Sequence, residues 1–247
     1  MQLHIYKNTK ELVDELAKWI TAYIIQALKK QDRFTIALSG GETPKSLYKA
    51  LSAEPYCKEI NWNKMHFFWG DERVVPFTDE RSNAKMAYEN LLNKVDIPAE
   101  NVHAMRTDLP PDAAAKEYEE ILHKYFNEPG NSFDLVLLGM GKDGHTLSLF
   151  PGSPVLIEPH NWVNSVFVKE QKMWRITLMP DVVNKASAII FLITGLDKSK
   201  ALQKVLEGPR EPYNYPAQFI DPANGELHWF LNDDAAKEIN KPSKENS

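Results

Sequence analysis

Apolar runs rich in β-branched and aromatic residues recur along this chain and alternate with segments of helical periodicity. The runs are residues 3–6, 33–39, 66–70, 133–139 and 188–194. Several of them are apolar almost without interruption, as in strands that are buried on both faces. Segments 82–92 and 112–126 carry apolar residues at helical spacing. This alternation favours a mostly parallel sheet that is covered by helices.

We therefore expect an α/β protein, built as a Rossmann-like three-layer sandwich with a mostly parallel central sheet and helices on both faces. Residues 162–168 and 175–179 are both strand-like and follow one another without a long helix. They predict a small antiparallel addition to this fold. No repeat or convincing linker interrupts the pattern, which favours a single domain over residues 1–247, with a frayed tail at 240–247.

The overall composition excludes several classes of protein. A net charge of -5 over 247 residues gives no support for a nucleic-acid-binding surface, although a small anionic ligand needs only a few cations. One cysteine forms no internal disulfide, which indicates a reducing compartment. The longest apolar run, 188–194, is too short to cross a bilayer, and no signal peptide is evident. We expect a cytoplasmic monomer or weak homo-oligomer with no nucleic-acid or membrane partner.

Two strand exits in the first third of the chain carry candidate site residues. In ALSGGETPKSL, Ser39, Gly40 and Gly41 separate a strand from a helix, with Thr43 as the expected N-cap. Glycines let a ligand approach the backbone and a helix N-terminus favours an anion, although the same pattern is also typical of a plain tight turn. In FFWGDERVVP, three charges follow an apolar strand: either Asp71 and Arg73 belong to a site, or the segment is a solvated loop.

Another strand exit, DLVLLGMGKDGHTLSLFPG, contains the spacing G-x-G-x-x-G of a dinucleotide-binding turn. That interpretation fails on context, because Pro151 and Gly152 end any helix early and only Glu158 stands near the place of the ribose-binding acid. The loop instead presents His145, with Asp143 two residues before it. A carboxylate can fix the tautomer of an imidazole and raise its basicity, as a general base requires.

Two cations complete the candidate set. Arg175 lies within a strand-like run, where a charge must find a partner, and Lys198 lies at a strand exit where a helix begins. Each could be an ordinary salt-bridge residue. Together with the Ser-Gly-Gly loop they predict a phosphate site, since arginine binds phosphate bidentately and lysine acts as a point charge.

Five blocks, in order, resemble the 6-phosphogluconolactonase family: ALSGGETPKSLY, FFWGDERVVP, DLVLLGMGKDGHTLSLFPGSP, RITLMP and ITGLDKSKAL. The related glucosamine-6-phosphate deaminases are expected to continue the DGH loop with I-A-F-N-E-P, whereas Thr146 to Pro151 read TLSLFP and lack that acid. The resemblance implies a metal-independent and cofactor-independent hydrolase of 6-phospho-D-glucono-1,5-lactone in the oxidative pentose phosphate pathway.

The resemblance assigns roles residue by residue. His145 is expected to activate water, Asp143 to orient it, and Arg73 or backbone N–H groups to meet the oxyanion, with Asp71 also in the site. The substrate and its phosphate are expected to contact the following residues: Ser39, Gly40, Gly41, Thr43, Gly141, Lys142, Gly144, Arg175 and Lys198. Ser148 is not expected to form a covalent intermediate, because no G-x-S-x-G elbow is present. A sugar-phosphate isomerase or deaminase and a non-catalytic phosphosugar sensor remain the alternatives.

Overall fold

The central sheet of the computed structural model, which describes residues 1–126, 131–157 and 161–240, contains six strands in the order β1-β9-β8-β5-β2-β3. These are β1 (Gln2–Tyr6), β2 (Phe34–Leu38), β3 (Met65–Trp69), β5 (Leu135–Leu138), β8 (Ala188–Ile193) and β9 (Glu226–Asn232). All five neighbouring pairs are parallel. Every residue of β2, β5 and β8 is buried, as their uninterrupted apolar sequences predict. The predicted α/β class is confirmed.

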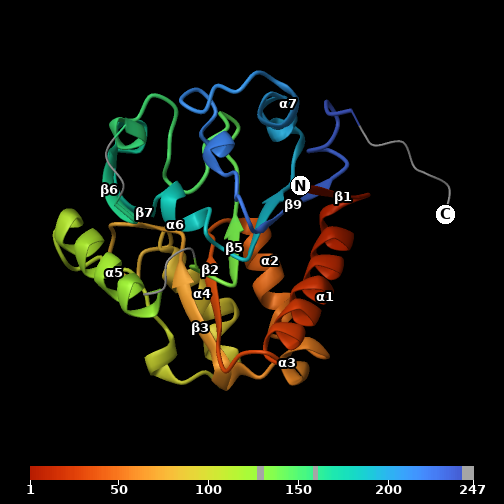
Figure 1. Ribbon diagram of the computed structural model, residues 1–247, viewed down its shortest axis with the longest axis vertical. Coiled ribbons are helices and arrows are strands. Elements are labelled where there is room, and N and C mark those ends of the chain that lie inside the picture. The colour runs from red at the N-terminus through yellow and green to blue at the C-terminus, as the bar shows by residue number, and fades with distance from the viewer. Residues whose placement is uncertain (127–130, 158–160, 241–247) are drawn as a thin grey trace.

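Helices cover this sheet. They are α1 (Thr9–Ala27), α2 (Glu42–Leu51), α3 (Tyr56–Glu59), α4 (Asn83–Asn90), α5 (Pro111–Tyr125), α6 (Pro180–Val183) and α7 (Ser199–Glu207). Figure 1 shows α1 and α2 together on the right of the sheet and α5 on its left. α1 begins where the side chain of Asn8 accepts a hydrogen bond from the Glu11 N–H (2.9 Å), and it buries a leucine and isoleucine stripe at helical spacing.

The predicted antiparallel addition is a separate small sheet with the order β4-β7-β6, formed by β4 (Asp71–Arg73), β6 (Val163–Val168) and β7 (Met173–Leu178). Gly70 joins the two sheets, because its N–H donates to Leu38 O (2.9 Å) while its carbonyl accepts from Leu178 N–H (2.8 Å). The solvated-loop interpretation of the charges after β3 is therefore wrong. Asp71 and Glu72 are buried in β4, where each has several hydrogen-bond donors.

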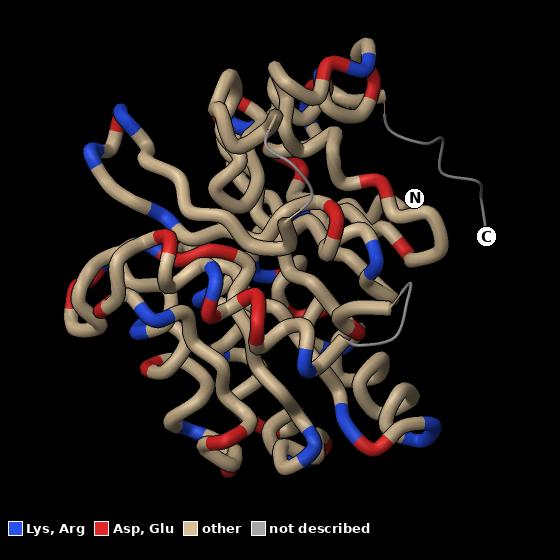
Figure 2. The backbone as a smooth tube through the Cα atoms, turned by 60° about the vertical axis from the view of Figure 1, so that its left-hand side comes forward, with Lys and Arg blue, Asp and Glu red and all other residues tan. Residues whose placement is uncertain are grey.

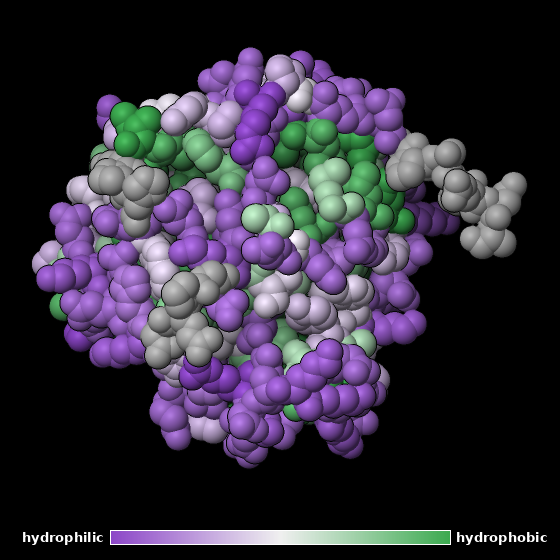
Figure 3. All heavy atoms as spheres, in the orientation of Figure 1, coloured by the Kyte–Doolittle hydropathy of each residue, from purple (hydrophilic) through white to green (hydrophobic). Residues whose placement is uncertain are grey.

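The surface is mostly polar around this core. In the view of Figure 3 hydrophilic residues dominate, with apolar residues gathered in the upper half, and Figure 2 shows acidic and basic residues interspersed along the chain. Among the residues that the structure describes, no helix combines the length and the apolar composition needed to cross a membrane. The expected frayed tail falls almost entirely on residues 241–247, and Glu158 likewise lies outside the described residues; Asn240 is described, and its N–H donates to Glu207.

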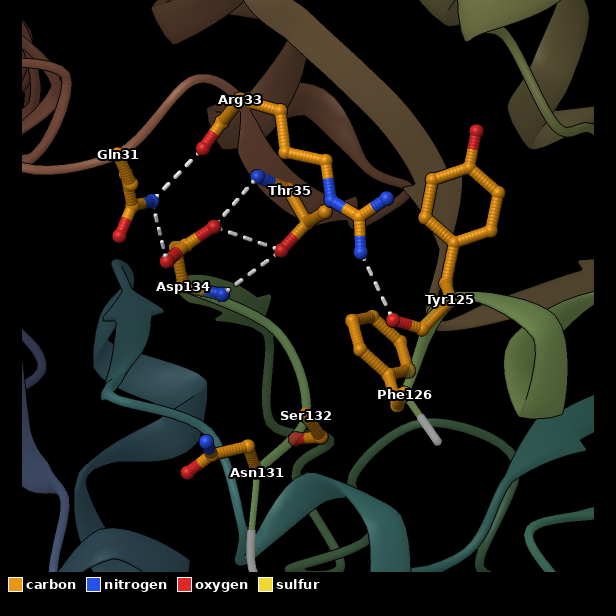
Figure 4. Close-up of a pocket in the computed structure, with 8 residues that line it drawn as sticks. All are labelled: Gln31, Arg33, Thr35, Tyr125, Phe126, Asn131, Ser132 and Asp134. Carbon is orange, nitrogen blue, oxygen red and sulfur yellow. Dashed lines mark hydrogen bonds between the residues drawn. The ribbon is translucent and has the colours of Figure 1, made fainter. Parts of the chain in front are cut away.

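β2 and β5 pair over only Ile36–Leu135 and Ala37–Val136, and a side chain extends this pairing at the amino ends of the strands. Asp134 Oδ2 accepts from the N–H (2.7 Å) and the hydroxyl (2.8 Å) of Thr35, and Asp134 Oδ1 accepts from Gln31 Nε2 (2.8 Å). Figure 4 shows these bonds converging on Asp134 beside a depression that lies at the opposite end of β2 and β5 from the loops after their carboxyl ends. This hydrogen-bond network therefore stabilises the sheet and lies away from those loops.

We expect Asp134→Ala to lower the free energy of unfolding by about 1.5–3 kcal/mol, because it removes charged hydrogen bonds and leaves the buried Thr35 N–H without its acceptor. Urea denaturation measures this loss. Activity of the folded fraction should be unchanged. Asp32→Ala is the matched control, since that fully exposed carboxylate lies 3.7 Å from Lys64, and its loss should leave stability unchanged. Equal stabilities of the two variants would contradict the proposed role of Asp134 in the pairing of β2 and β5.

Candidate active site

A cavity of about 360 Å³ opens at the carboxyl ends of β2, β3 and β5, where ligands bind in open α/β sheets. Its described lining residues are Ser39, Gly40, Gly41, Asp71, Arg73, Gly139, Met140, Gly141, His145, Leu147, Gln171, Arg175 and Lys198. The strand exits singled out in the sequence thus meet in one place. The small sheet closes one wall of the cavity, because Asp71 and Arg73 come from β4 and Arg175 comes from β7.

His145 is fixed by Asp143. Its Nδ1 lies 2.6 Å from Asp143 Oδ1, which also accepts a bond from the His145 backbone N–H (3.2 Å). An ionised carboxylate can only accept a hydrogen bond, so Nδ1 carries the proton and Nε2 keeps its lone pair. The imidazole side chain is 27% exposed and lines the cavity. This is the arrangement that a general base needs.

Glycines make this arrangement possible. A Cβ at Gly141 would lie 2.1 Å from His145 Nδ1 and 2.4 Å from Asp143 Oδ1, so any larger residue would displace both side chains. Gly141 N–H also donates to the His145 carbonyl (2.8 Å) and closes the turn. Gly144 has a φ of 80°, which favours glycine, and its backbone lies against Tyr215. The glycine spacing therefore serves the His145 loop rather than a nucleotide.

Burial alone would raise the pKa of Asp143, but its hydrogen bond to His145 and the charge of that ring lower the pKa to about 2. The carboxylate therefore stays ionised at neutral pH. Its support of His145 is lost only in strong acid.

This lowered pKa predicts a pH-dependent contribution to stability. Because the folded value lies below the unfolded value of about 3.9, the stabilisation is complete above pH 4 and disappears as the pH falls toward about 2. Urea unfolding of wild type and Asp143→Asn should accordingly differ at pH 6 and converge between pH 4 and pH 2. A difference that stayed constant with pH would contradict the assignment. Asp32→Asn, which removes a fully exposed carboxylate, controls for a general loss of surface charge.

Asp71 is buried and has three side-chain partners. Its Oδ2 accepts from the Ser148 hydroxyl (2.6 Å) and lies 3.4 Å from Arg175 Nη1, while its Oδ1 accepts from Asn83 Nδ2 (3.2 Å). The contacts suit a carboxylate that orients Arg175 better than one that moves a proton. Ser148 is fully buried and donates its hydroxyl to Asp71, which agrees with the expectation that it is no nucleophile.

Arg73 and Arg175 lie directly opposite each other on the antiparallel strands β4 and β7. Burial lowers the pKa of Arg175, Asp71 opposes this effect, and the like charge of Arg73 adds to it. The Nε atoms of both arginines are buried without a hydrogen-bond partner. Two adjacent cations with unsatisfied donors beside a cavity form an arrangement that a bound anion would stabilise.

The Ser-Gly-Gly loop is fixed by the side chain of Tyr48. The buried hydroxyl of Tyr48 donates to Ser39 O (2.7 Å) and accepts from Ser39 N–H (2.9 Å), so this N–H is not available to a ligand. The expected N-cap is also wrong, because α2 begins at Glu42 and Gly41 is its N-cap. The Thr43 hydroxyl instead bonds to Thr194 (2.8 Å), which joins this loop to the end of β8. Gly41 takes the cap because its φ of 109° is unfavourable for other residues.

Of the other expected residues, only some line the cavity. Lys198 lines it and pairs with Asp197 (3.2 Å), whereas Thr43, Lys142 and Gly144 are not among its described lining residues. Lys142 is exposed. Two further residues of the site were not predicted from the sequence: Gln171, which accepts a hydrogen bond from Arg175 Nη2, and Phe150, whose ring centroid lies 4.2 Å from that of His145. Neither carries a motif signal, because both depend on the folding of the small sheet and the His145 loop.

Residues 7–229 match the family model described as glucosamine-6-phosphate isomerases/6-phosphogluconolactonase. The chain belongs to this family. Within it, the chain is similar to a curated 6-phosphogluconolactonase from Nostoc sp., with 44% identity over 217 residues, which cover 86% of this chain and 88% of the relative.

Solved structures of the family agree in fold. The 6-phosphogluconolactonase from Trypanosoma cruzi matches with a TM-score of 0.84 and 29% identity, covering 96% of each chain. A monomeric glucosamine-6-phosphate deaminase matches with a TM-score of 0.81 at 18% identity, covering 97% of this chain and 100% of that one, and shares the fold alone. The family that the sequence motifs resemble is thereby confirmed.

Proposed function

We propose that this protein hydrolyses 6-phospho-D-glucono-1,5-lactone to 6-phospho-D-gluconate, the second step of the oxidative pentose phosphate pathway. The observation that carries the proposal is the oriented imidazole of His145 in a cavity that also contains Arg73, Arg175 and Lys198. Curated relatives named 6-phosphogluconolactonase support the choice of substrate. A cytoplasmic location and a monomeric or weakly associating state belong to the same proposal.

The reaction begins with water. His145 Nε2 removes a proton as the water oxygen attacks the lactone carbonyl carbon, and the charge that develops on the carbonyl oxygen is stabilised by Arg73 or by backbone N–H groups of the glycine loops. The bond from this carbon to the ring oxygen then breaks. The imidazolium returns its proton to the departing ring oxygen, which leaves an open-chain acid that ionises at neutral pH. Asp143 stabilises the imidazolium throughout.

The phosphate is the second point of attachment. We assign it to Arg175 and Lys198, together with N–H groups of Gly40, Gly41 and Thr43, which lies in the first turn of α2 where N–H groups lack an intrahelical acceptor. Arg175 suits this role because Asp71 orients it and its Nε lacks a protein partner. Anchoring at the phosphate positions the distant carbonyl at His145, which is where binding energy assists catalysis.

The activity is tested by generating the lactone in the cuvette with glucose-6-phosphate dehydrogenase and following its disappearance with and without the protein. We expect disappearance well above the spontaneous rate, with formation of 6-phosphogluconate. A deaminase on this fold would instead release ammonia from glucosamine 6-phosphate, and a sensor would bind without turnover. Ammonia release, or a lactone half-life that the protein does not change, would contradict the proposal.

A further inference from the structure

Asn83 is the first residue of α4, but it does not cap this helix. That task belongs to Ser82, whose hydroxyl accepts a hydrogen bond from Lys85 N–H (3.1 Å). Asn83 has a different environment. Asn83 is only 3% exposed, so its polar amide is buried and needs hydrogen-bond partners.

One partner is Asp71. Asn83 Nδ2 donates to the Asp71 carbonyl (2.9 Å) and to Asp71 Oδ1 (3.2 Å). The other carboxylate oxygen, Oδ2, faces the Ser148 hydroxyl and Arg175. By holding the backbone and one oxygen of Asp71 at the same time, the amide determines the direction in which the second oxygen points toward Arg175.

A second neighbour is the Ser-Gly-Gly loop. A Cβ built on Gly40 would lie 1.9 Å from Asn83 Oδ1, 2.5 Å from Cγ and 2.9 Å from Nδ2, so the amide packs against the bare backbone of Gly40. All three atoms belong to Asn83. The two residues therefore set the spacing between the loop after β2 and the strand β4, which are two walls of the cavity.

The backbone of Asn83 is itself fixed by a buried carboxylate. Glu72, which is 1% exposed, accepts hydrogen bonds from the N–H groups of Asn83 (2.8 Å), Ala84 (2.7 Å) and Arg73 (2.7 Å). A negative charge is also favourable at the N-terminus of α4. The start of this helix is thereby attached to β4, next to Asp71.

We propose that Asn83 is a positioning residue for the phosphate end of the site: it orients Arg175 through Asp71 and sets the distance of the Gly40 loop. This inference rests on the assignment of the phosphate to Arg175 and the glycine loop. Asn83 need not touch the substrate. Its effect is on binding, because both structures that it holds are assigned to the phosphate rather than to the water or the ring oxygen.

The test compares Asn83→Ala with Ser82→Ala, which removes the cap and a bond to Glu72 but leaves the contacts with Asp71 and Gly40 in place. For Asn83→Ala we expect KM and the Kd for 6-phosphogluconate to rise about tenfold, with kcat nearly unchanged. Ser82→Ala should lower the Tm without changing either constant. The Kd for gluconate, which lacks the phosphate, should be the same in all three proteins.

Calorimetry with Arg175→Ala distinguishes a failure of the proposed role of Asn83 from a failure of the phosphate assignment. If Arg175→Ala weakens 6-phosphogluconate binding and Asn83→Ala does not, the inference about Asn83 is wrong and the proposed site survives. If neither substitution weakens binding, the phosphate assignment fails and the inference fails with it. A fall in kcat at constant KM in Asn83→Ala would also contradict the proposed role.

The contact with Gly40 has its own test. Gly40→Ala in the wild type should raise KM by about tenfold or more, because the new Cβ would overlap the Asn83 amide. In the Asn83→Ala background the three overlapping atoms are gone, so the same substitution should add only a small further change. An equal effect of Gly40→Ala in both backgrounds would show that Asn83 does not set the position of this loop.

Discussion

Replacing His145 with alanine should lower kcat by about 10²–10⁴-fold and leave KM close to its wild-type value, once spontaneous hydrolysis is subtracted. The ring supplies both proton transfers of the proposed mechanism, and Nε2 is its nitrogen with a free lone pair. The phosphate contacts come from other elements, so binding should persist. The measurement is initial-rate kinetics with lactone generated in place.

Two controls make this result interpretable. His145→Gln keeps a polar side chain beside Asp143 but has no group that can take and return a proton, so its kcat should fall to a similar extent. His123→Ala removes a histidine of α5 whose ring contacts Trp162 away from the cavity, and it should retain wild-type kcat. A His145→Ala variant with unchanged kcat would show that another group activates the water.

Arg175 should show the opposite kinetic pattern. Because a charged hydrogen bond contributes about 1.5–3 kcal/mol, Arg175→Ala should raise KM by about 10- to 100-fold with a smaller change in kcat. Arg175→Lys retains the charge but loses the planar fork, and we expect an intermediate KM. The same order should appear in the Kd for 6-phosphogluconate.

Stability must be followed in this series, because Arg175→Ala leaves the buried carboxylate of Asp71 without its cation. Lys198→Ala provides an independent measurement, since its side chain is 25% exposed and pairs with the exposed Asp197, so its loss leaves no buried charge. It should also raise KM. If both variants are folded and bind 6-phosphogluconate like the wild type, the phosphate lies elsewhere.

The sequence predicted the features that depend on local pattern. Apolar runs identified the buried strands β2, β5 and β8, and the glycine-rich segment after β5 indicated a loop that presents His145. His145 and Lys198 could be assigned to one place because strand exits of a parallel sheet share an edge, whereas Asp71 is assigned to the site mainly by the family resemblance and Arg175 as a charge that needs a partner. The family resemblance added the identity of the substrate.

The remaining features depend on contacts between distant segments. Asp71–Arg73 reads as a charged loop, and it becomes strand β4 only because β7 pairs with it more than a hundred residues later. Tyr48 and Asn83 have no local signal for their roles at Ser39 and Asp71, since each acts through tertiary packing. Thr43 reads as an N-cap by residue type, but Gly41 caps α2 by its backbone conformation.

The most direct test of the account is a crystal structure of the protein with 6-phosphogluconate bound. We predict the phosphate in hydrogen-bonding contact with Arg175 and Lys198, and the carboxylate carbon, which marks the former lactone carbonyl, facing Nε2 of His145. A phosphate bound away from both cations, or a carboxylate beyond the reach of His145, would contradict the mechanism proposed for this cavity.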